Sequence, residues 1–463
     1  MINLESQQLF FTGGTSVNVI RPLTIERGLT VVVGPNGSGK TLFAGILEKG
    51  WNFRTNRISS ISGIKPVVRY MAFNDIHAWV GFSVGHYQQR YEAAMNDEVP
   101  TVREILGDRT ESDLFRKLAE SLKLSECFDK KINFLSSGEL RKLLIINVLH
   151  EKPDLLILDN PYIGLDPPSR ESVNETLRQL VDDGQSVMLL LSDGAEAPSF
   201  TDHRIYVDNL RISTEPFQEK REFSMAPLDF RKEMPVGESE EVLVSLERCN
   251  VTFGSKVIIE NLDWEIRSGE KWSLSGPNGS GKSTLLSLIY ADNPKSYSNN
   301  ITLFGRRRGS GESIWDIKRE IGFVSPEMQL HFHGSGTVEQ IIANGYNDTV
   351  GLFVKPTCEQ LGRARQWLDH FGLIHLAPRS FMTLSSGERQ MVLVIRSMIK
   401  EPRLLILDEP MHALDPVMKH RLGRIIEEFT VAHPRSAMIF VTHNESELPS
   451  SVTHHLKLSN HAS

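Results

Sequence analysis

The sequence contains two identical phosphate-binding loops, and a residue with a hydroxyl group follows each of them. Gly-Pro-Asn-Gly-Ser-Gly-Lys occupies residues 34–40 and again 276–282, followed by Thr41 and Ser283. Glycines in such a loop allow backbone N–H groups to surround phosphate oxygens, the lysine contacts the terminal phosphates, and the hydroxyl oxygen contacts Mg²⁺. Because both copies are complete, the sequence predicts two sites that bind a nucleoside triphosphate with Mg²⁺.

Each loop lies in the sequence context that this motif requires. A short apolar segment precedes it (29–33 and 271–275), and a helical pattern begins at Leu42 or Leu285. A strand, a glycine turn and a helix place the positive end of the helix dipole at the phosphates. The residues expected to bind the nucleotide are Gly34, Asn36, Gly37, Gly39, Lys40 and Thr41 in the first loop and Gly276, Asn278, Gly279, Gly281, Lys282, Ser283 and Thr284 in the second.

Two further motifs follow each loop. Leu-Ser-Ser-Gly-Glu occurs at 135–139 and 384–388, and an apolar Leu-Leu-Ile-Leu-Asp segment ends at Asp159 and at Asp408. The same number of residues separates the two motifs in both copies, which indicates duplicated domains. The Ser-x-x-Glu pattern also fits a capping box at the start of a helix, and a capped helix N-terminus is a structure that binds phosphate.

Composition limits the class of protein. The chain has 463 residues, a net charge of -7 and three widely separated cysteines, so neither a disulfide framework nor a nucleic-acid-binding face is indicated. No signal-peptide pattern and no apolar run near 20 residues is present. We therefore expect a cytoplasmic protein, or one held at the inner face of the cell membrane by another chain that supplies the spans.

The repeat predicts two α/β domains joined by a linker. The first domain is expected at 1–213, a polar linker with three prolines at 214–241, and the second domain at 242–463. Alternating strands and helices around a phosphate loop predict a mainly parallel central sheet flanked by helices. The segments 74–125 and 299–378 are expected to be mostly helical and to form a side subdomain in each domain.

A phosphate loop, a Leu-Ser-Ser-Gly-Glu segment and an aspartate that closes an apolar strand, in this order, resemble the ABC ATPase family. The resemblance covers both halves of the chain except the linker. It implies two P-loop NTPase domains of the ABC type that bind ATP and Mg²⁺ and pair head to tail within one chain. Each ATP would lie between the phosphate loop of one domain and the Leu-Ser-Ser-Gly-Glu segment of the other, where Ser136, Gly138, Ser385 and Gly387 would contact it.

The resemblance also implies roles for single residues. Glu409 would polarise the attacking water, His443 would contact the γ-phosphate, and Lys282 would bind the phosphates. Phe11 and Phe253, each at the same distance before its loop lysine, would stack on adenine. The expected metal-binding residues are Thr41, Gln88 and Asp159 in the first half and Ser283 and Asp408 in the second.

The two halves differ at the catalytic positions. Asn160 follows Asp159 where the family has glutamate, and Asp193 stands where the histidine is expected. An amide cannot accept a proton at neutral pH, and general-base catalysis typically contributes about 10²–10⁴ in rate. We therefore expect ATP hydrolysis mainly at the site of the second domain. A second interpretation of Asn160, as a neutral replacement without mechanistic weight, stays open.

Two other segments have more than one interpretation. Glu327 stands near the position where the family has a metal-contacting glutamine, and the residues alone do not assign it that role. Arg306, Arg307 and Arg308 form a basic run that fits either a contact with a partner or nucleic acid, or a solvated turn.

The sequence leaves two function classes open. The segments 292–299 and 303–318 are similar to the tandem ATPases associated with molybdate transport and photorepair, the ModF-like group. This resemblance implies an ATPase that energises a separate membrane permease for molybdate or a related cargo. The alternative is a soluble ATP-dependent switch that acts on a nucleic acid, a ribosome or a regulatory partner, since one fold serves many functions.

Overall fold

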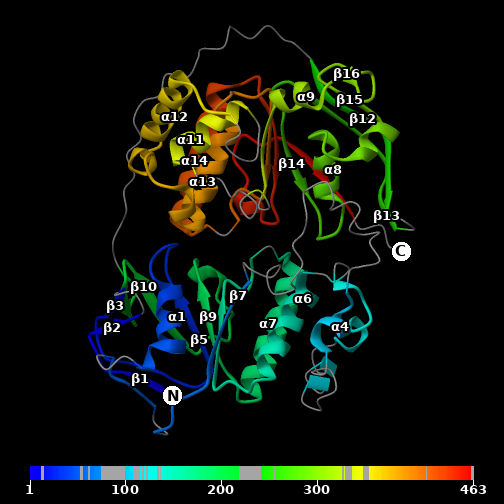
Figure 1. Cartoon of the computed structure of the whole chain (residues 1–463). Coiled ribbons are helices and arrows are strands. Elements are labelled where there is room, and N and C mark those ends of the chain that lie inside the picture. Colours follow the sequence, from blue (N-terminus) through cyan, green and yellow to red (C-terminus); the bar gives the residue numbers. More distant parts are fainter. Residues whose placement is uncertain are drawn as a thin grey trace. The chain divides into compact units, whose positions relative to one another are not determined.

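The computed structural model divides the chain into two compact units, Met1–Lys220 (unit 1) and Arg221–Ser463 (unit 2) (Figure 1). The described residues are 1–11, 15–52, 56–60, 63–73, 100–107, 115–116, 119–120, 124–132, 135, 137–163, 165–217, 241–253, 256–325, 328, 336–347, 354–412 and 414–459. Most of the expected linker, 214–241, lies outside these ranges. The first described strand of unit 2 begins at Val242.

In unit 1, the described residues form an eight-stranded sheet whose five strands around the phosphate loop are parallel. Its strands, in spatial order, are β2 (Gln8–Phe10), β3 (Ser16–Val19), β11 (Arg211–Ser213), β10 (His203–Asp208), β5 (Leu29–Val33), β9 (Ser186–Leu191), β8 (Leu155–Asp159) and β7 (Val68–Ala72). The remaining described strands are β4 (Leu23–Ile25), β1 (Ile2–Leu4) and β6 (Ile58–Ser60), and the α-helices are α1 (Lys40–Lys49), α4 (Val102–Leu106), α6 (Ser137–Leu149) and α7 (Pro167–Asp182).

In unit 2, the described residues form two separate sheets. The parallel sheet contains β17 (Ile321–Val324), β18 (Leu404–Asp408), β19 (Ala437–Val441), β14 (Lys271–Ser275) and β20 (His454–Lys457), and the antiparallel sheet contains β13 (Lys256–Arg267), β12 (Val242–Phe253), β15 (Asn300–Leu303) and β16 (Arg306–Arg307). The α-helices are α8 (Lys282–Ile289), α9 (Ile314–Glu320), α11 (Val338–Ala343), α12 (Cys358–His370), α13 (Ser386–Met398) and α14 (Pro416–Ala432).

Helices cover both faces of the central parallel strands, which explains why β8, β9, β18 and β19 are almost entirely apolar. In unit 2, Leu405 and Leu407 of β18 join a core with α13 and α14, while Leu404 and Ile406 join a core with α8 on the other face. Figure 1 shows α11–α14 gathered on one side of this sheet. In unit 1, α1 covers one face of β8, and α6 and α7 cover the other. This packing places Asp159 and Asp408 at the carboxyl ends of β8 and β18.

The expectation that 299–378 is mostly helical is wrong for its first part. Residues 300–324 contain β15, β16 and β17, with α9 between them, and the helices α11 and α12 come only afterwards. The alternation of buried Ile301 and Leu303 with less buried neighbours is the pattern of a strand with one covered face. In the first half, 74–99 lies outside the described residues, and the remainder includes α4.

Candidate functional site

The two phosphate loops have the same geometry in both units. Each α-helix, α1 or α8, begins at the loop lysine, and the glycine before it has a left-handed φ, 108° at Gly39 and 93° at Gly281. Lys40 Nζ donates to the carbonyl oxygens of the first two loop residues at 2.6 and 3.0 Å, and Lys282 Nζ does so at 2.7 and 3.1 Å. Each lysine therefore closes over its own loop, where phosphate oxygens can replace these carbonyls.

A serine in each loop has the same buried environment in both units. Among the described residues, Ser38 Oγ and Ser280 Oγ are buried and have no hydrogen-bond partner. Buried polar atoms without a partner are rare in proteins, and the same atom is unpaired in both copies. Sequence analysis did not single out these serines, although both lie inside the repeated heptapeptide.

Two of the three expected metal-binding residues of unit 1, Thr41 and Asp159, lie together. Thr41 Oγ1, in the first turn of α1, donates to Asp159 Oδ2 at 2.8 Å. Two further donors contact this carboxylate: Tyr70 Oη reaches Oδ2 at 2.8 Å, and Asn160 Nδ2 reaches Oδ1 at 2.9 Å. The Thr41 hydroxyl and the Asp159 carboxylate would offer only oxygen atoms to a metal. Such a set fits Mg²⁺, whose other ligands would include phosphate oxygens. In unit 2, Ser283 and Asp408 lie at the same places, in the first turn of α8 and at the end of β18.

Glu409 and His443 lie together at the carboxyl edge of the unit 2 sheet. His443 Nε2 is 2.8 Å from Glu409 Oε1, an ion-pair distance, although the ring N–H is not aligned for a hydrogen bond. Burial by itself would raise the pKa of Glu409, but His443 and the positive charges of His412 and Lys282 outweigh burial and hold the pKa below its ordinary value. The carboxylate is therefore ionised at neutral pH, which is the form that can accept a proton.

Asn160 occupies the backbone position of Glu409. Both residues have a left-handed φ, 50° and 48°, and each backbone N–H donates at 3.0 Å to the neighbouring strand, to Leu190 O or Val441 O. Asparagine adopts this conformation readily, whereas glutamate there is strained, and such strain is concentrated at functional sites. The Glu409 backbone is thus kept in a strained conformation that presents its carboxylate beside His443.

Strand register corrects the expected counterpart of His443. Asp159 pairs with Leu190, and Asp408 pairs with Val441. His443 is the second residue after Val441, and the second residue after Leu190 is Ser192, not Asp193. Asp193 instead accepts from Ala195 N at 2.8 Å and caps a short 3-10 helix. Unit 1 therefore has a serine hydroxyl where unit 2 has an imidazole.

The Leu-Ser-Ser-Gly-Glu segments begin α6 and α13. The capping box is confirmed in unit 2, where Ser385 N and Oγ donate to Glu388 Oε2 at 2.8 and 2.9 Å. In unit 1, where Ser136 lies outside the described residues, Glu139 accepts from Lys130 Nζ at 3.0 Å and from Cys127 Sγ at 3.2 Å. Gly138 and Gly387 lie in the first turns of these helices.

Several expected site residues are only partly described. Ser136, Gln88 and Glu327 lie outside the described residues, and Phe253 ends β12 with its side chain outside them. Phe11 is half-buried and packs against α1, where a Cβ on Gly45 would lie 3.2 Å from its ring. The stacking of both rings on adenine therefore stays a prediction.

A known protein family matches the two segments that contain the phosphate loops, Asp159, Asp408 and Glu409. The sequence profile of the family described as ABC transporter matches residues 22–163 and 259–412. The chain belongs to the ABC transporter family. The expected fold class, two P-loop domains of the ABC type with parallel sheets, is confirmed by the match of both segments and by the strand order.

This ABC protein is similar to other tandem proteins along its whole length. It is 33% identical to the ABC transporter ATP-binding protein ModF of Escherichia coli (strain K12), over 97% of this chain and 95% of that protein. It is 27% identical to an uncharacterized ABC transporter ATP-binding protein of Schizosaccharomyces pombe, over 93% and 92%. A solved structure of ribosome-bound archaeal Pelota and ABCE1 matches with a TM-score of 0.61 and 21% identity, over 98% of this chain and 76% of that one. That likeness shows the fold alone.

Within the described parts of this ABC protein, no helix is both long and apolar enough to cross a bilayer.

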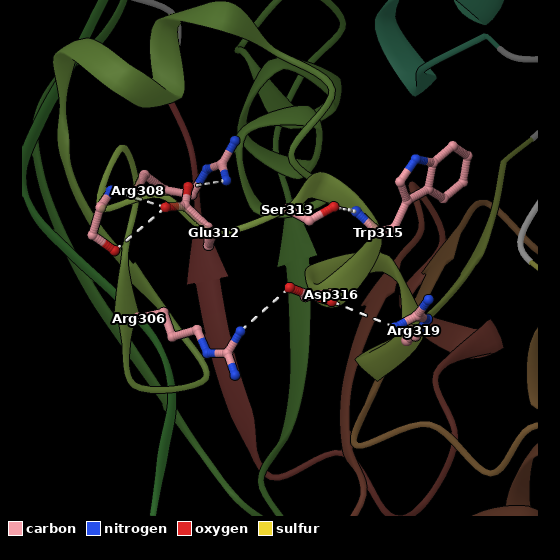
Figure 2. Close-up of polar contacts among 8 residues, drawn as sticks. Arg306, Arg308, Glu312, Ser313, Trp315, Asp316 and Arg319 are labelled. Atoms are coloured by element: carbon pink, nitrogen blue, oxygen red, sulfur yellow. Dashed lines mark hydrogen bonds and ion pairs between the residues drawn. The ribbon is translucent and has the colours of Figure 1, made fainter.

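The arginine run of this ABC protein is only partly solvated (Figure 2). Arg308 and Glu312 form an ion pair at 2.5 Å, with side chains 0% and 2% exposed. Glu312 also accepts from Gly309 N and Ser310 N, both at 2.9 Å, and Arg308 lies over the Tyr297 ring. The interpretation as a solvated turn is therefore wrong for Arg308, which holds the turn together, while Arg306 is exposed.

Breaking this pair should destabilise unit 2. The pair lies in a turn whose residues Gly309 and Ser310 are exposed, so we expect Glu312→Ala to lower the free energy of unfolding by about 1–3 kcal/mol, less than for a deeply buried pair. Burial alone would raise the pKa of Glu312, but the N–H groups of Gly309 and Ser310 and the Arg308 charge keep it lowered. The stabilisation is therefore complete above about pH 4.3 and is lost as the pH falls through the lower folded value. Urea unfolding at neutral pH measures the loss of stability. Glu312→Gln is expected to lower the free energy of unfolding less than Glu312→Ala does. Equal stability of the wild type and both variants would contradict this role of the ion pair.

Proposed function

We propose that this protein is an ATPase with two unequal nucleotide sites, in which hydrolysis occurs mainly at the site built on Lys282 and Glu409. The contact between Glu409 and His443 is the observation that supports it most directly. The same positions in unit 1 hold Asn160, which cannot accept a proton, and Ser192, which is neutral. The unit 1 site would bind ATP and turn it over slowly.

We further propose that the two domains pair head to tail, as the family resemblance implies. The site on Lys282 would be completed by the segment 136–139, and the site on Lys40 by the segment 385–388. Mg²⁺ would be held by Thr41, Asp159 and Gln88 in one site and by Ser283 and Asp408 in the other. The position of the second segment at the start of α13 supports this assignment, because the positive end of the helix dipole lies there and favours a phosphate.

As the wider role, we propose that the protein energises a separate membrane permease, with molybdate or a related oxyanion as cargo. The support is the 33% identity to a relative named as an ABC transporter ATP-binding protein, over nearly the whole of both chains. The protein would then work at the inner face of the cell membrane, held there by the permease.

A cross-linking experiment tests this role. Glu409→Gln should bind ATP and hydrolyse it slowly, so the ATP-bound form accumulates in cells and can be cross-linked to what it contacts. We expect an integral membrane protein as the main cross-linked partner and several-fold enrichment of the variant in membranes. A Lys282→Ala protein, which lacks the phosphate-binding lysine, should lose this enrichment. Cross-links to ribosomes, nucleic acid or a cytosolic regulator would instead support the soluble switch.

A further inference from the structure

The carboxylate of Asp159 accepts hydrogen bonds from three protein donors. Thr41 Oγ1 and Tyr70 Oη both donate to Oδ2, and Asn160 Nδ2 donates to Oδ1. A carboxylate has about four acceptor sites, two on each oxygen. Three of these sites are thus used by protein donors, and the residue is only 5% exposed, so the carboxylate can accept few further hydrogen bonds.

Of these three donors, only Thr41 stands at the position after the loop lysine, whose hydroxyl the motif assigns to Mg²⁺. A threonine hydroxyl can donate its hydrogen to Asp159 and still offer an oxygen lone pair to Mg²⁺. The Tyr70 hydroxyl comes from the neighbouring strand, and the Asn160 amide comes from the residue that follows β8. Both donate hydrogen bonds to the Asp159 carboxylate, whose negative charge would otherwise attract the metal or a water molecule bound to the metal.

Unit 2 has neither of these two donors. In β17, Phe323 pairs with Ile406 as Tyr70 pairs with Ile157 in β7, so Phe323 occupies the position of Tyr70. Phe323 has no hydroxyl group, and its ring stacks on Tyr290 with the centroids 4.4 Å apart. Glu409 replaces Asn160 and, when ionised, only accepts hydrogen bonds.

We infer that Tyr70 and Asn160 are positioning residues that occupy Asp159 and weaken metal binding at the phosphate loop of unit 1. The inference rests on the proposed function and deepens it: the slow site would lack a base, and its metal-binding carboxylate would already accept hydrogen bonds from two other protein donors. The site would retain ATP mainly through the loop N–H groups and Lys40, with Mg²⁺ bound weakly.

Mn²⁺ binding tests this inference without reference to turnover. In a Lys282→Ala background, which disables the second loop, the protein is loaded with ATP and titrated with Mn²⁺, and free Mn²⁺ is measured by electron paramagnetic resonance. Removing a hydrogen bond to a charged group should tighten the Mn²⁺ dissociation constant on the order of tenfold in Tyr70→Phe, and similarly in Asn160→Ala. Tyr206→Phe, in β10 of the same sheet, is the matched control and should change nothing.

The outcomes separate the inference from the function on which it rests. Unchanged or weaker Mn²⁺ affinity in Tyr70→Phe overturns the role of the tyrosine, and the same result in Asn160→Ala overturns that of the asparagine. ADP is counted in the same samples after acid quenching. Rapid ADP formation in the Lys282→Ala background would contradict the single productive site, whatever the Mn²⁺ affinities show.

Discussion

Replacement of Glu409 by glutamine is expected to lower steady-state ATP turnover by about 10²–10⁴-fold, the range that general-base catalysis typically contributes. The carboxylate lies beside His443, and its pKa is held below the ordinary value, so it is ionised at neutral pH. Glutamine keeps the shape of the side chain but cannot accept a proton. Phosphate release at saturating ATP measures the effect, and ATP binding should be retained.

The matched change in unit 1 is Asn160→Ala, which alters the residue with the same backbone conformation and the same strand contact. We expect turnover to stay within about twofold of wild type, because the barrier at this site already lacks the contribution of a base. Near-wild-type turnover in Glu409→Gln, or an equally large loss in Asn160→Ala, would contradict the assignment of hydrolysis to unit 2.

The second large effect is expected from aspartate at the two helix starts. Ser136→Asp should lower turnover by about 10²-fold, because its charge would face the γ-phosphate of the ATP bound at Lys282 and would replace a hydrogen bond to a charged group. Ser385→Asp should cost less than about fivefold, since it would face the slow site. Aspartate caps a helix as well as serine does, so both variants should fold.

This pair of variants tests the head-to-tail pairing. Ser385 and Glu409 belong to the same unit, whereas Ser136 belongs to the other. If Ser385→Asp impaired turnover more than Ser136→Asp, each helix start would serve the phosphate loop of its own unit, and the pairing would be wrong. Thermal unfolding of both variants, within about 1 kcal/mol of wild type, is the control for folding.

Local patterns were sufficient to predict the parts of the site that lie on regular elements. The apolar segments before the loops are strands β5 and β14 with the expected bounds, and both motif aspartates end buried strands. A glycine loop between a strand and a helix has one geometry, so the lysine and hydroxyl positions followed from the motif.

Features that depend on neighbouring strands could not be read from the motifs. Counting along the sequence suggested Asp193 as the counterpart of His443, but the strand pairing assigns Ser192, because only the pairing fixes where β9 ends relative to β8. Tyr70 contacts Asp159 across two adjacent strands, at a separation that no local pattern reports. The burial of Arg308 likewise depends on Glu312 and on the glycine turn that brings them together.

The most direct test of a single productive site is the nucleotide content of the chain after one turnover. Protein saturated with radiolabelled ATP and Mg²⁺ is separated rapidly from free nucleotide, allowed to react, quenched in acid at intervals, and analysed for ADP and ATP. We expect a fast phase that ends with one ADP and one ATP per chain. Two ADP formed per chain in the fast phase would contradict it.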